Sequence, residues 1–275
     1  MTDIDLGIGQ ILSDNVAIIV SNYNYGEYVL EAIDSARFQD YEGDVRVYVV
    51  DDGSTDDSWD KISSITEKLP TVTLEKPYYT GAMEIRQADS LYAYRIDNSG
   101  ASTARNVAIW EAWEWASNFA ILDADDEMHD NKISSLVPYL EEYSEIGVVY
   151  ADYKIHRSYG GKNYIKHEYK YPYSTHELRR HCIVHSGAVI SKRYLRAVVN
   201  SETLEFYDSN LHGPGSQQFI GCTEDYDLWL RLSEVCVMTH VPIALSFVRE
   251  TGNNQSLKMT DQIFNANMQK ISSKT

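Results

Sequence analysis

Acidic side chains follow apolar runs at two places in the first half of this 275-residue sequence. Asp51-Asp52 comes after Val45–Val50, and Asp123-Ala124-Asp125-Asp126 comes after Phe119–Leu122. Carboxylates one residue apart can divide their work, since one can accept a ligand hydroxyl while the other binds Mg²⁺ or Mn²⁺ together with phosphate oxygens and water. The pattern suggests a nucleotide diphosphate bound through a divalent cation. A lone D-x-D is a weak signal and by itself is more typical of a solvated helix start, where Asp residues are favourable.

A third acidic cluster lies near the C-terminal end, at Glu224 and Asp225. Leu228, Trp229 and Leu232 follow with helical spacing, which places both carboxylates at the N-terminus of a helix. A carboxylate there is a candidate general base for an acceptor hydroxyl. The alternative is an ordinary helix with an acidic first turn and a surface ion pair.

The elements that must position these groups alternate between strands and helices. Strands are expected at residues 16–20, 45–50, 91–96 and 119–122, and helices at 27–39, 55–68, 101–117 and 132–143. This alternation predicts an α/β fold with a mainly parallel central sheet flanked by helices, a Rossmann-like arrangement. Ligands bind such sheets at the carboxyl ends of the strands. The polar clusters at 22–24, 51–52 and 123–126 should therefore meet at one edge.

The connections are less regular than these elements. Ser54 or Thr55 is expected to cap the second helix. Residues 72–89 are longer than a simple connection needs and predict an inserted hairpin or a lid. Beyond Gln255 the chain is polar and suggests a terminal helix.

Charge is distributed unevenly along the chain. Lys and Arg number 24 against 41 Asp and Glu, a net charge of −17, which argues against general binding to nucleic acid or to an anionic membrane. Residues 151–200 contain ten basic and three acidic side chains, a net charge of +7, so the rest of the chain carries −24. This window suggests an acceptor that bears phosphate or carboxylate. The alternative is that its cations pair with the acidic remainder, and nucleic acid as acceptor is disfavoured without being excluded.

The sequence also bears on compartment. No basic leader precedes an apolar segment, and no apolar run approaches the length of a membrane span, so we expect a cytoplasmic protein without a transmembrane segment. Three cysteines lack metal-binding spacing and are expected to be reduced and structural: Cys182, Cys222 and Cys236.

Five ordered segments resemble glycosyltransferase family 2, whose members have the GT-A fold. The matching segments are Val16–Tyr28, Val49–Asp56, Asn98–Asn106, Leu122–Asp126 and Glu224–Arg231. The resemblance implies one GT-A domain over residues 1–250, with a nucleotide-sugar-binding half (16–130), an acceptor-binding half (131–250) and a C-terminal tail (251–275). It also implies inverting transfer from a nucleoside-diphosphate sugar, with Mn²⁺ or Mg²⁺ as cofactor. A UDP-sugar is the expected donor by family frequency, and a glycan, a lipid-linked glycan or another anionic molecule is the expected acceptor.

The resemblance assigns roles residue by residue. It implies that Ser21, Tyr23 and Asp52 contact the nucleoside base and that the segment containing Arg105 closes over the nucleotide. It implies ribose contact for Asp123 and metal binding for Asp125, with Asp126 as a possible substitute. Asp225 is implied as the catalytic base, with Glu224 beside it.

The chain departs from the family pattern in two ways. Many relatives carry a metal-binding His near the end of the domain, where this chain has Thr251, so a His ligand from that loop is in doubt. The Gln-x-x-Arg-Trp motif and the membrane spans of processive members do not occur, which favours a single addition per acceptor.

Two rival functions use the same fold. A nucleotidyltransferase would need a Gly-rich basic loop, whereas Ser21–Tyr28 has one Gly and no Lys or Arg. A catalytically inactive sugar-nucleotide-binding protein is the other rival.

Two further features allow two interpretations each. His185 either approaches the acceptor or is an ordinary turn histidine, and the tyrosines of residues 150–173 either stack on sugars or reflect strand propensity.

Overall fold

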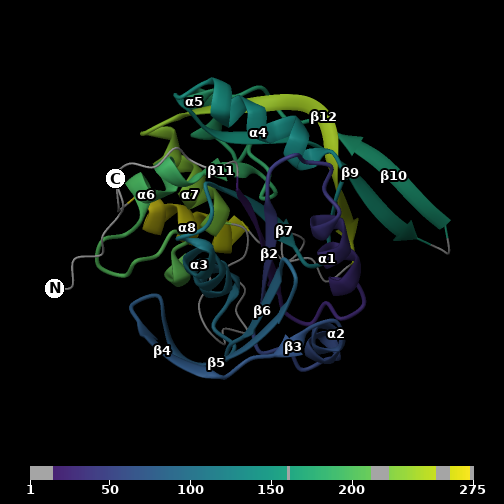
Figure 1. Ribbon diagram of the computed structural model, residues 1–275. Coiled ribbons are helices and arrows are strands. Elements are labelled where there is room, and N and C mark those ends of the chain that lie inside the picture. The colour runs from purple at the N-terminus through teal and green to yellow at the C-terminus, as the bar shows by residue number, and fades with distance from the viewer. Residues whose placement is uncertain (1–14, 160–161, 212–222, 252–260, 273–275) are drawn as a thin grey trace.

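A central sheet with helices on both faces organises the protein (Figure 1). The computed structural model describes residues 15–159, 162–211, 223–251 and 261–272. Within these ranges the sheet has 12 strands, ten of them in the order β3-β5-β6-β2-β1-β7-β11-β9-β12-β8, while β4 pairs with β5 and β10 with β9. The strands are β1 (Val16–Asn22), β2 (Val45–Asp51), β3 (Glu67–Lys68), β4 (Val72–Lys76), β5 (Tyr79–Ala88), β6 (Leu91–Arg95), β7 (Asn118–Asp123), β8 (Glu127–Met128), β9 (Ile146–Tyr159), β10 (Lys162–Glu168), β11 (Val189–Ser191) and β12 (Val237–Glu250).

The parallel half of the sheet forms because its strands are apolar on both faces. β1 pairs in parallel with β2 and β7, and β2 pairs in parallel with β6. Ala17 and Ile19 face one core while Ile18 and Val20 face the other, and all four are 0% exposed. A continuous apolar run is what a doubly covered strand requires. The predicted α/β class with a mainly parallel sheet is confirmed.

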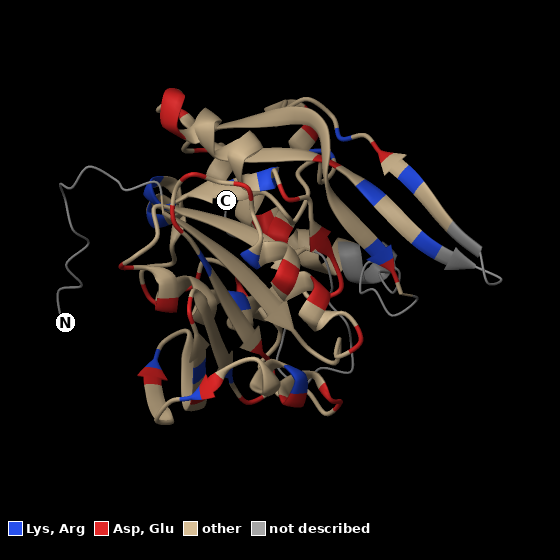
Figure 2. Ribbon diagram, turned by 45° about the vertical axis from the view of Figure 1, so that its right-hand side comes forward, with Lys and Arg blue, Asp and Glu red and all other residues tan. Residues whose placement is uncertain are grey.

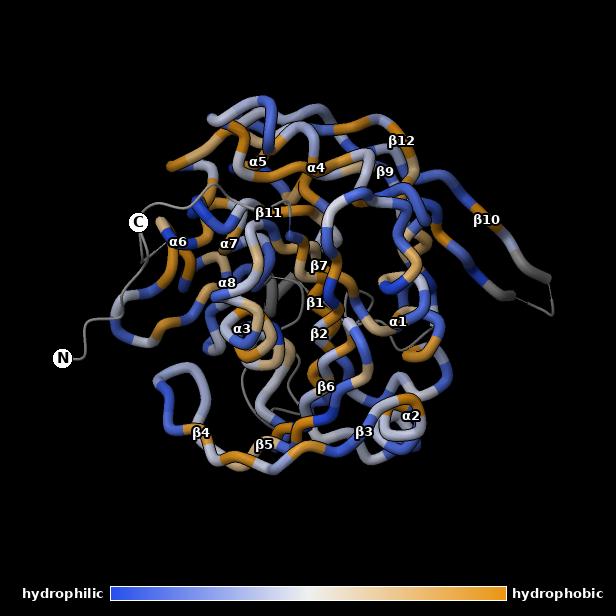
Figure 3. The backbone as a smooth tube through the Cα atoms, in the orientation of Figure 1, coloured by the Kyte–Doolittle hydropathy of each residue, from blue (hydrophilic) through white to orange (hydrophobic). Residues whose placement is uncertain are grey.

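The helices cover the sheet in two layers, and the apolar strands lie between them (Figure 3). Buried residues of α1, α2 and α4 pack on one face, and those of α3, α6 and α7 pack on the other. The described helices of four or more residues are α1 (Val29–Arg37), α2 (Ser58–Ser64), α3 (Ala101–Ala112), α4 (Lys132–Glu142), α5 (Thr175–Leu178), α6 (Lys192–Val198), α7 (Glu224–Ser233) and α8 (Asp261–Ser272). Helix α8 lies in the expected tail and packs on the same body, since Asn267 Nδ2 donates to Thr223 Oγ1 (2.7 Å).

The predicted cap of the second helix is wrong. Helix α2 starts at Ser58, and its N-cap residue is Asp57. Ser54 Oγ instead accepts hydrogen bonds from Asn22 Nδ2 (3.1 Å) and Asn24 N (2.9 Å), and Thr55 N donates to Asn24 Oδ1 (2.8 Å). These residues tie the loop after β1 to the loop after β2. The two residues that local sequence predicts as helix caps, Ser54 and Thr55, therefore hold these two loops together instead.

Residues 72–89 form the hairpin that the sequence allowed. β4 and β5 pair as an antiparallel hairpin, and β5 pairs with β6 to extend the sheet. At the turn, the Tyr78 ring stacks on Trp110 of α3, with ring centroids 5.8 Å apart. The hairpin is therefore anchored to the edge of the fold.

A buried amide joins the two halves of the chain on the α3 face. Asn106 is 0% exposed, its Nδ2 donates to Tyr207 O (2.7 Å), and its Oδ1 accepts from Phe206 N (3.0 Å) and Tyr207 N (2.9 Å). We expect Asn106→Ala to lower the free energy of unfolding by about 2 kcal/mol or more, because buried backbone groups would lose their partners. Urea unfolding measures this, with exposed Asn210→Ala as the control, expected to change it by less than about 0.5 kcal/mol. Equal midpoints for both variants would contradict the role of this amide.

Candidate functional site

The carboxyl ends of β1, β2 and β7 meet at one edge of the sheet. In register, Ser21 lies beside both Val50 and Asp123, and Asn22 lies beside Asp51. The sheet therefore brings the three predicted polar clusters together. This convergence follows from parallel pairing alone, because parallel strands end at the same edge.

Asp52 occupies the centre of the proposed base-binding side. It is 3% exposed, and its two carboxylate oxygens accept hydrogen bonds from the backbone N–H groups of Ser99 (2.7 Å) and Gly100 (2.8 Å) at the start of α3. Burial raises the pKa of Asp52 to about 7, against the effect of these hydrogen bonds. Asp52 thus also fixes the loop that leads into α3, a role the sequence did not indicate. Ser21 is half-buried and Tyr23 is 43% exposed, so Tyr23 is open to a ligand.

Arg105 joins three predicted site carboxylates. Its guanidinium is 5% exposed and donates to Asp123 Oδ1 (2.7 Å), Glu224 Oε1 (2.8 Å) and Asp225 Oδ1 (3.4 Å). The sequence placed Arg105 in a segment that closes over the nucleotide. In the structure its guanidinium connects the carboxyl end of strand β7, at Asp123, to the start of helix α7, at Glu224 and Asp225. It thereby links two segments of the chain that lie more than 100 positions apart.

The two carboxylates of helix α7 differ in exposure. The Glu224 side chain is 4% exposed and that of Asp225 is 14% exposed, so Asp225 is the more accessible of the pair. Burial raises the pKa of Asp225 to about 7, with Arg105 acting in the opposite direction and Glu224 adding to the increase. A carboxylate with a pKa near neutrality is suited to accept a proton at physiological pH.

Asp125 and Asp126 point to different partners. Asp125 forms a side-chain hydrogen bond with Tyr25, and burial together with the nearby Asp123 raises its pKa to about 7. Asp126 Oδ1 accepts from Arg249 N of β12 (3.0 Å). Because Asp126 is committed to the backbone of β12, the geometry favours Asp125 as the cation ligand.

The donor atoms here fit a hard divalent cation. No three His, Cys, Asp or Glu side chains form a ready metal cluster among the described residues. Mg²⁺ needs only one or two protein carboxylates when phosphate oxygens and water complete its shell. Asp125, with Asp123 nearby, meets that requirement through oxygen atoms alone.

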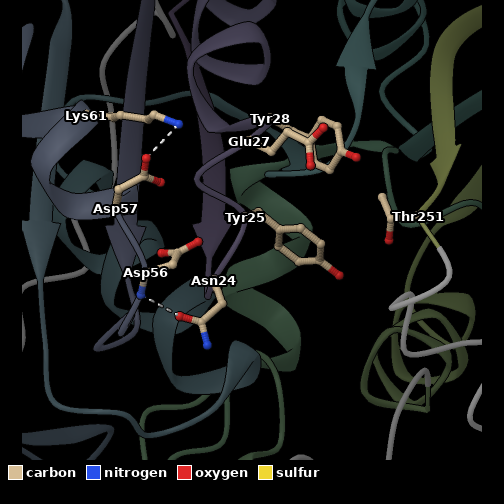
Figure 4. A pocket seen from close by; sticks show the side chains of 8 residues that line it. All are labelled: Asn24, Tyr25, Glu27, Tyr28, Asp56, Asp57, Lys61 and Thr251. Atoms are coloured by element: carbon tan, nitrogen blue, oxygen red, sulfur yellow. Dashed lines mark hydrogen bonds and ion pairs between the residues drawn. The ribbon is translucent and has the colours of Figure 1, made fainter.

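A pocket of about 480 Å³ opens beside Tyr25 (Figure 4). It is lined by Asn24, Tyr25, Glu27, Tyr28, Asp56, Asp57, Lys61 and Thr251. Thr251, the residue at the place of the expected His, is among the lining residues and so faces this pocket. Its volume is in the range of small-molecule sites. Sequence reasoning missed Lys61 in the pocket wall, because it lies outside the five matched segments, and it assigned no role to Glu27, which lies within one of them.

The basic window is partly neutralised by the acidic remainder. Arg179 pairs with Glu234 (2.8 Å) and Arg157 with Glu250, both outside the window, while Lys166 pairs with Glu168 inside it (2.7 Å). Figure 2 shows Lys and Arg bands along the hairpin of β9 and β10, which extends away from the body of the fold. The charge of +7 is therefore not all available to an acceptor.

The remaining expectations concern His185 and the cysteines. His185 Nδ1 accepts from Gly187 N (3.1 Å), and burial lowers its pKa well below the usual value, as expected of a neutral turn histidine. Cys182 and Cys236 are free thiols with no disulfide, and Cys222 lies outside the described residues. Among the described residues, none of the helices has both the length and the apolar character needed to cross a membrane.

The parallel strands, with carboxylates gathered at their carboxyl ends, define an α/β protein whose candidate site lies at one edge of the sheet. The family described as "Glycosyl transferase family 2" matches residues 17–199 of the chain. The chain belongs to this family, and the resemblance noted from the five motifs is confirmed.

Curated relatives match part of the chain. A glycosyltransferase of Nostoc sp. is 30% identical over 135 residues, which is 49% of this chain and 35% of the relative. The Escherichia coli UDP-Glc:alpha-D-GlcNAc-diphosphoundecaprenol beta-1,3-glucosyltransferase WfaP is 27% identical over 144 residues, 52% of this chain and 48% of the relative. The chain thus spans between about a third and a half of the length of these relatives.

Solved structures share the fold. S. aureus TarS 1-349 in complex with UDP aligns with a TM-score of 0.58 at 15% identity, over 94% of this chain and 64% of that one. The mannosyltransferase PcManGT of Pyrobaculum calidifontis, in complex with GDP-Man and Mn²⁺, aligns with a TM-score of 0.50 at 15% identity, over 84% of this chain and 56% of that one. At such identities the likeness supports the GT-A fold.

Proposed function

We propose that this protein transfers one sugar from a nucleoside-diphosphate sugar to a hydroxyl group of an acceptor, with inversion at the anomeric carbon. The observation that carries the proposal is the joining of Asp123 and Asp225 by Arg105. That contact supports a base at the start of helix α7 that acts beside the carboxyl end of strand β7.

In this mechanism each carboxylate has a separate task. A carboxylate oxygen of Asp225 accepts the proton of the acceptor hydroxyl. As the proton leaves, the hydroxyl oxygen of the acceptor attacks the anomeric carbon, and the bond from that carbon to the diphosphate breaks on the opposite face. Arg105 holds Asp225 through Oδ1, and Asp123, Asp52, Ser21 and Tyr23 position the nucleoside. A divalent cation held by Asp125 would offset the charge that develops on the departing diphosphate.

The relatives favour a UDP-sugar as donor and a glycan, free or lipid-linked, as acceptor. TarS has been crystallised with UDP, and the name of WfaP includes UDP-Glc and a lipid-linked diphosphate acceptor. PcManGT holds GDP-Man and Mn²⁺. We propose Mn²⁺ or Mg²⁺ as the cofactor and a single addition per acceptor.

Nucleotide release tests the proposal. The protein is incubated with UDP-, GDP- and dTDP-sugars with Mn²⁺, and with EDTA in a parallel series, and free nucleotide is measured. Slow cation-dependent release from one donor, with water as acceptor, supports a transferase. Binding without release would indicate an inactive module, and diphosphate release from a nucleoside triphosphate plus a sugar phosphate would indicate a nucleotidyltransferase.

The pH profile should report the proposed base. Because the pKa of Asp225 is about 7, about nine-tenths of this group is protonated and inactive as a base at pH 6. We therefore expect kcat/KM to rise about tenfold between pH 6 and pH 8. Donor affinity measured at the same pH values separates this effect from titration of Asp52. A flat profile between pH 5.5 and pH 8 would contradict Asp225 as base.

A further inference from the structure

A row of half-buried side chains leads from Asp123 away from the nucleotide-binding edge. Ser186 Oγ donates to Asp123 Oδ2 (3.4 Å), and the neighbouring His185 ring lies 4.3 Å from the Tyr153 ring, measured between centroids. Lys170 Nζ lies over the same Tyr153 ring, 5.7 Å from its centroid. The row ends at the ammonium group of Lys170.

The ammonium of Lys170 has no carboxylate partner in the part of the chain that the structure describes. Its two acidic neighbours are committed elsewhere: Glu168 pairs with Lys166 (2.7 Å), and Asp152 Oδ1 accepts from Lys170's own backbone N–H (2.8 Å) and contacts His240 Nε2 (2.8 Å). Burial lowers the pKa of Lys170. A half-buried cation without an anion is costly unless a ligand supplies one.

Lys170 and the candidate base also share a neighbour. The pKa of the Cys182 thiol is raised by Asp225 and lowered by Lys170, so both charged groups lie near this thiol. Tyr169 and Tyr171, on either side of Lys170 in the chain, are 72% and 60% exposed. Tyrosine rings match the apolar faces of sugars, so a charged and an aromatic contact occur together here.

We propose that Lys170 binds an anionic group on the acceptor, a phosphate or a carboxylate attached to its sugar, with Tyr153 beneath the ammonium. This inference rests on the proposed transferase function and gives its acceptor a chemical class. Lysine binds such groups as a point charge, which requires no planar bidentate geometry. It also gives a role to an ammonium that has no acidic partner among the described residues, whereas Arg157, Lys166 and Arg179 each have one.

Binding of matched probes tests the inference. The protein is first saturated with UDP and Mn²⁺ to fill the donor site, and calorimetry of that step reports donor binding by itself. It is then titrated with N-acetylglucosamine 1-phosphate, with glucuronic acid and with neutral methyl N-acetylglucosaminide. We expect one anionic probe to bind at least about tenfold more tightly than the neutral probe, and Lys170→Met to remove that preference. The two anionic probes distinguish phosphate from carboxylate.

Two variants keep the result interpretable. Lys166→Met removes a nearby exposed charge that is already paired, and it should retain the preference; Lys170→Arg keeps the charge and should retain most of it. Equal binding of charged and neutral probes by the wild type, or equal losses in Lys166→Met and Lys170→Met, would overturn the inference while UDP binding stands. Failure of UDP to bind the wild type would instead overturn the proposed function.

Discussion

Asp225→Asn is expected to lower kcat by about 10²- to 10⁴-fold, the usual contribution of a general base, while donor affinity stays within about twofold. The amide keeps the shape of the side chain and can still accept a hydrogen bond from Arg105, but it cannot take a proton from the acceptor hydroxyl. Donor binding is retained because the nucleoside contacts are proposed at Asp123 and Asp52. Single-turnover transfer and calorimetry with the UDP-sugar measure the two quantities separately.

Glu224→Gln is the matched comparison for Asp225→Asn. Glu224 is more deeply buried and accepts from the same guanidinium, so its replacement should act by shifting Arg105 and cost less activity. A larger loss for Glu224→Gln than for Asp225→Asn would exchange the roles of the two residues. Full activity of Asp225→Asn would remove the general-base assignment.

The sequence was sufficient for those parts of the site that follow from strand ends. Asp123 lies beside Ser21, and Asp51 beside Asn22, because apolar runs of strand length define parallel strands, and the carboxyl ends of parallel strands converge. The helix that carries Asp225 could be predicted from the spacing of Leu228 and Leu232. These features depend on local periodicity and on a general rule of sheet topology.

The contacts between these elements could not be predicted. Arg105 and Glu224 are 119 positions apart, and nothing in the spacing of either segment pairs them. Ser54 has a residue type that caps helices, yet tertiary contacts with Asn22 and Asn24 decide its partners. The net charge of residues 151–200 likewise could not show which cations are neutralised, because Arg179 and Glu234 meet only in the folded chain.

Arg105→Met is expected to lower the free energy of unfolding by about 3–5 kcal/mol, the usual cost of leaving a buried charge without its partner. Arg105 and Glu224 are 5% and 4% exposed, whereas the more exposed Asp123 is screened by solvent and should add little. Arg105 lowers the pKa of Asp225, so without the guanidinium Asp225 should bind a proton more readily. The destabilisation should therefore be larger at pH 8, where an ionised Asp225 lacks its partner, than at pH 6, and urea unfolding at both pH values measures this difference.

The same change should couple to Glu224 in a double-mutant cycle. Arg105→Met with Glu224→Gln removes both charges of the buried pair, so the double variant should be less destabilised than the sum of the single variants by about 1–3 kcal/mol. Arg105→Lys should be intermediate, because one ammonium cannot donate to Asp123 and Glu224 with the fork geometry of a guanidinium. The Arg105 guanidinium also packs over the Tyr207 ring, 5.3 Å from its centroid. Additive losses, or a destabilisation that does not change between pH 6 and pH 8, would show that Arg105 stabilises the fold through this packing and not through its charge.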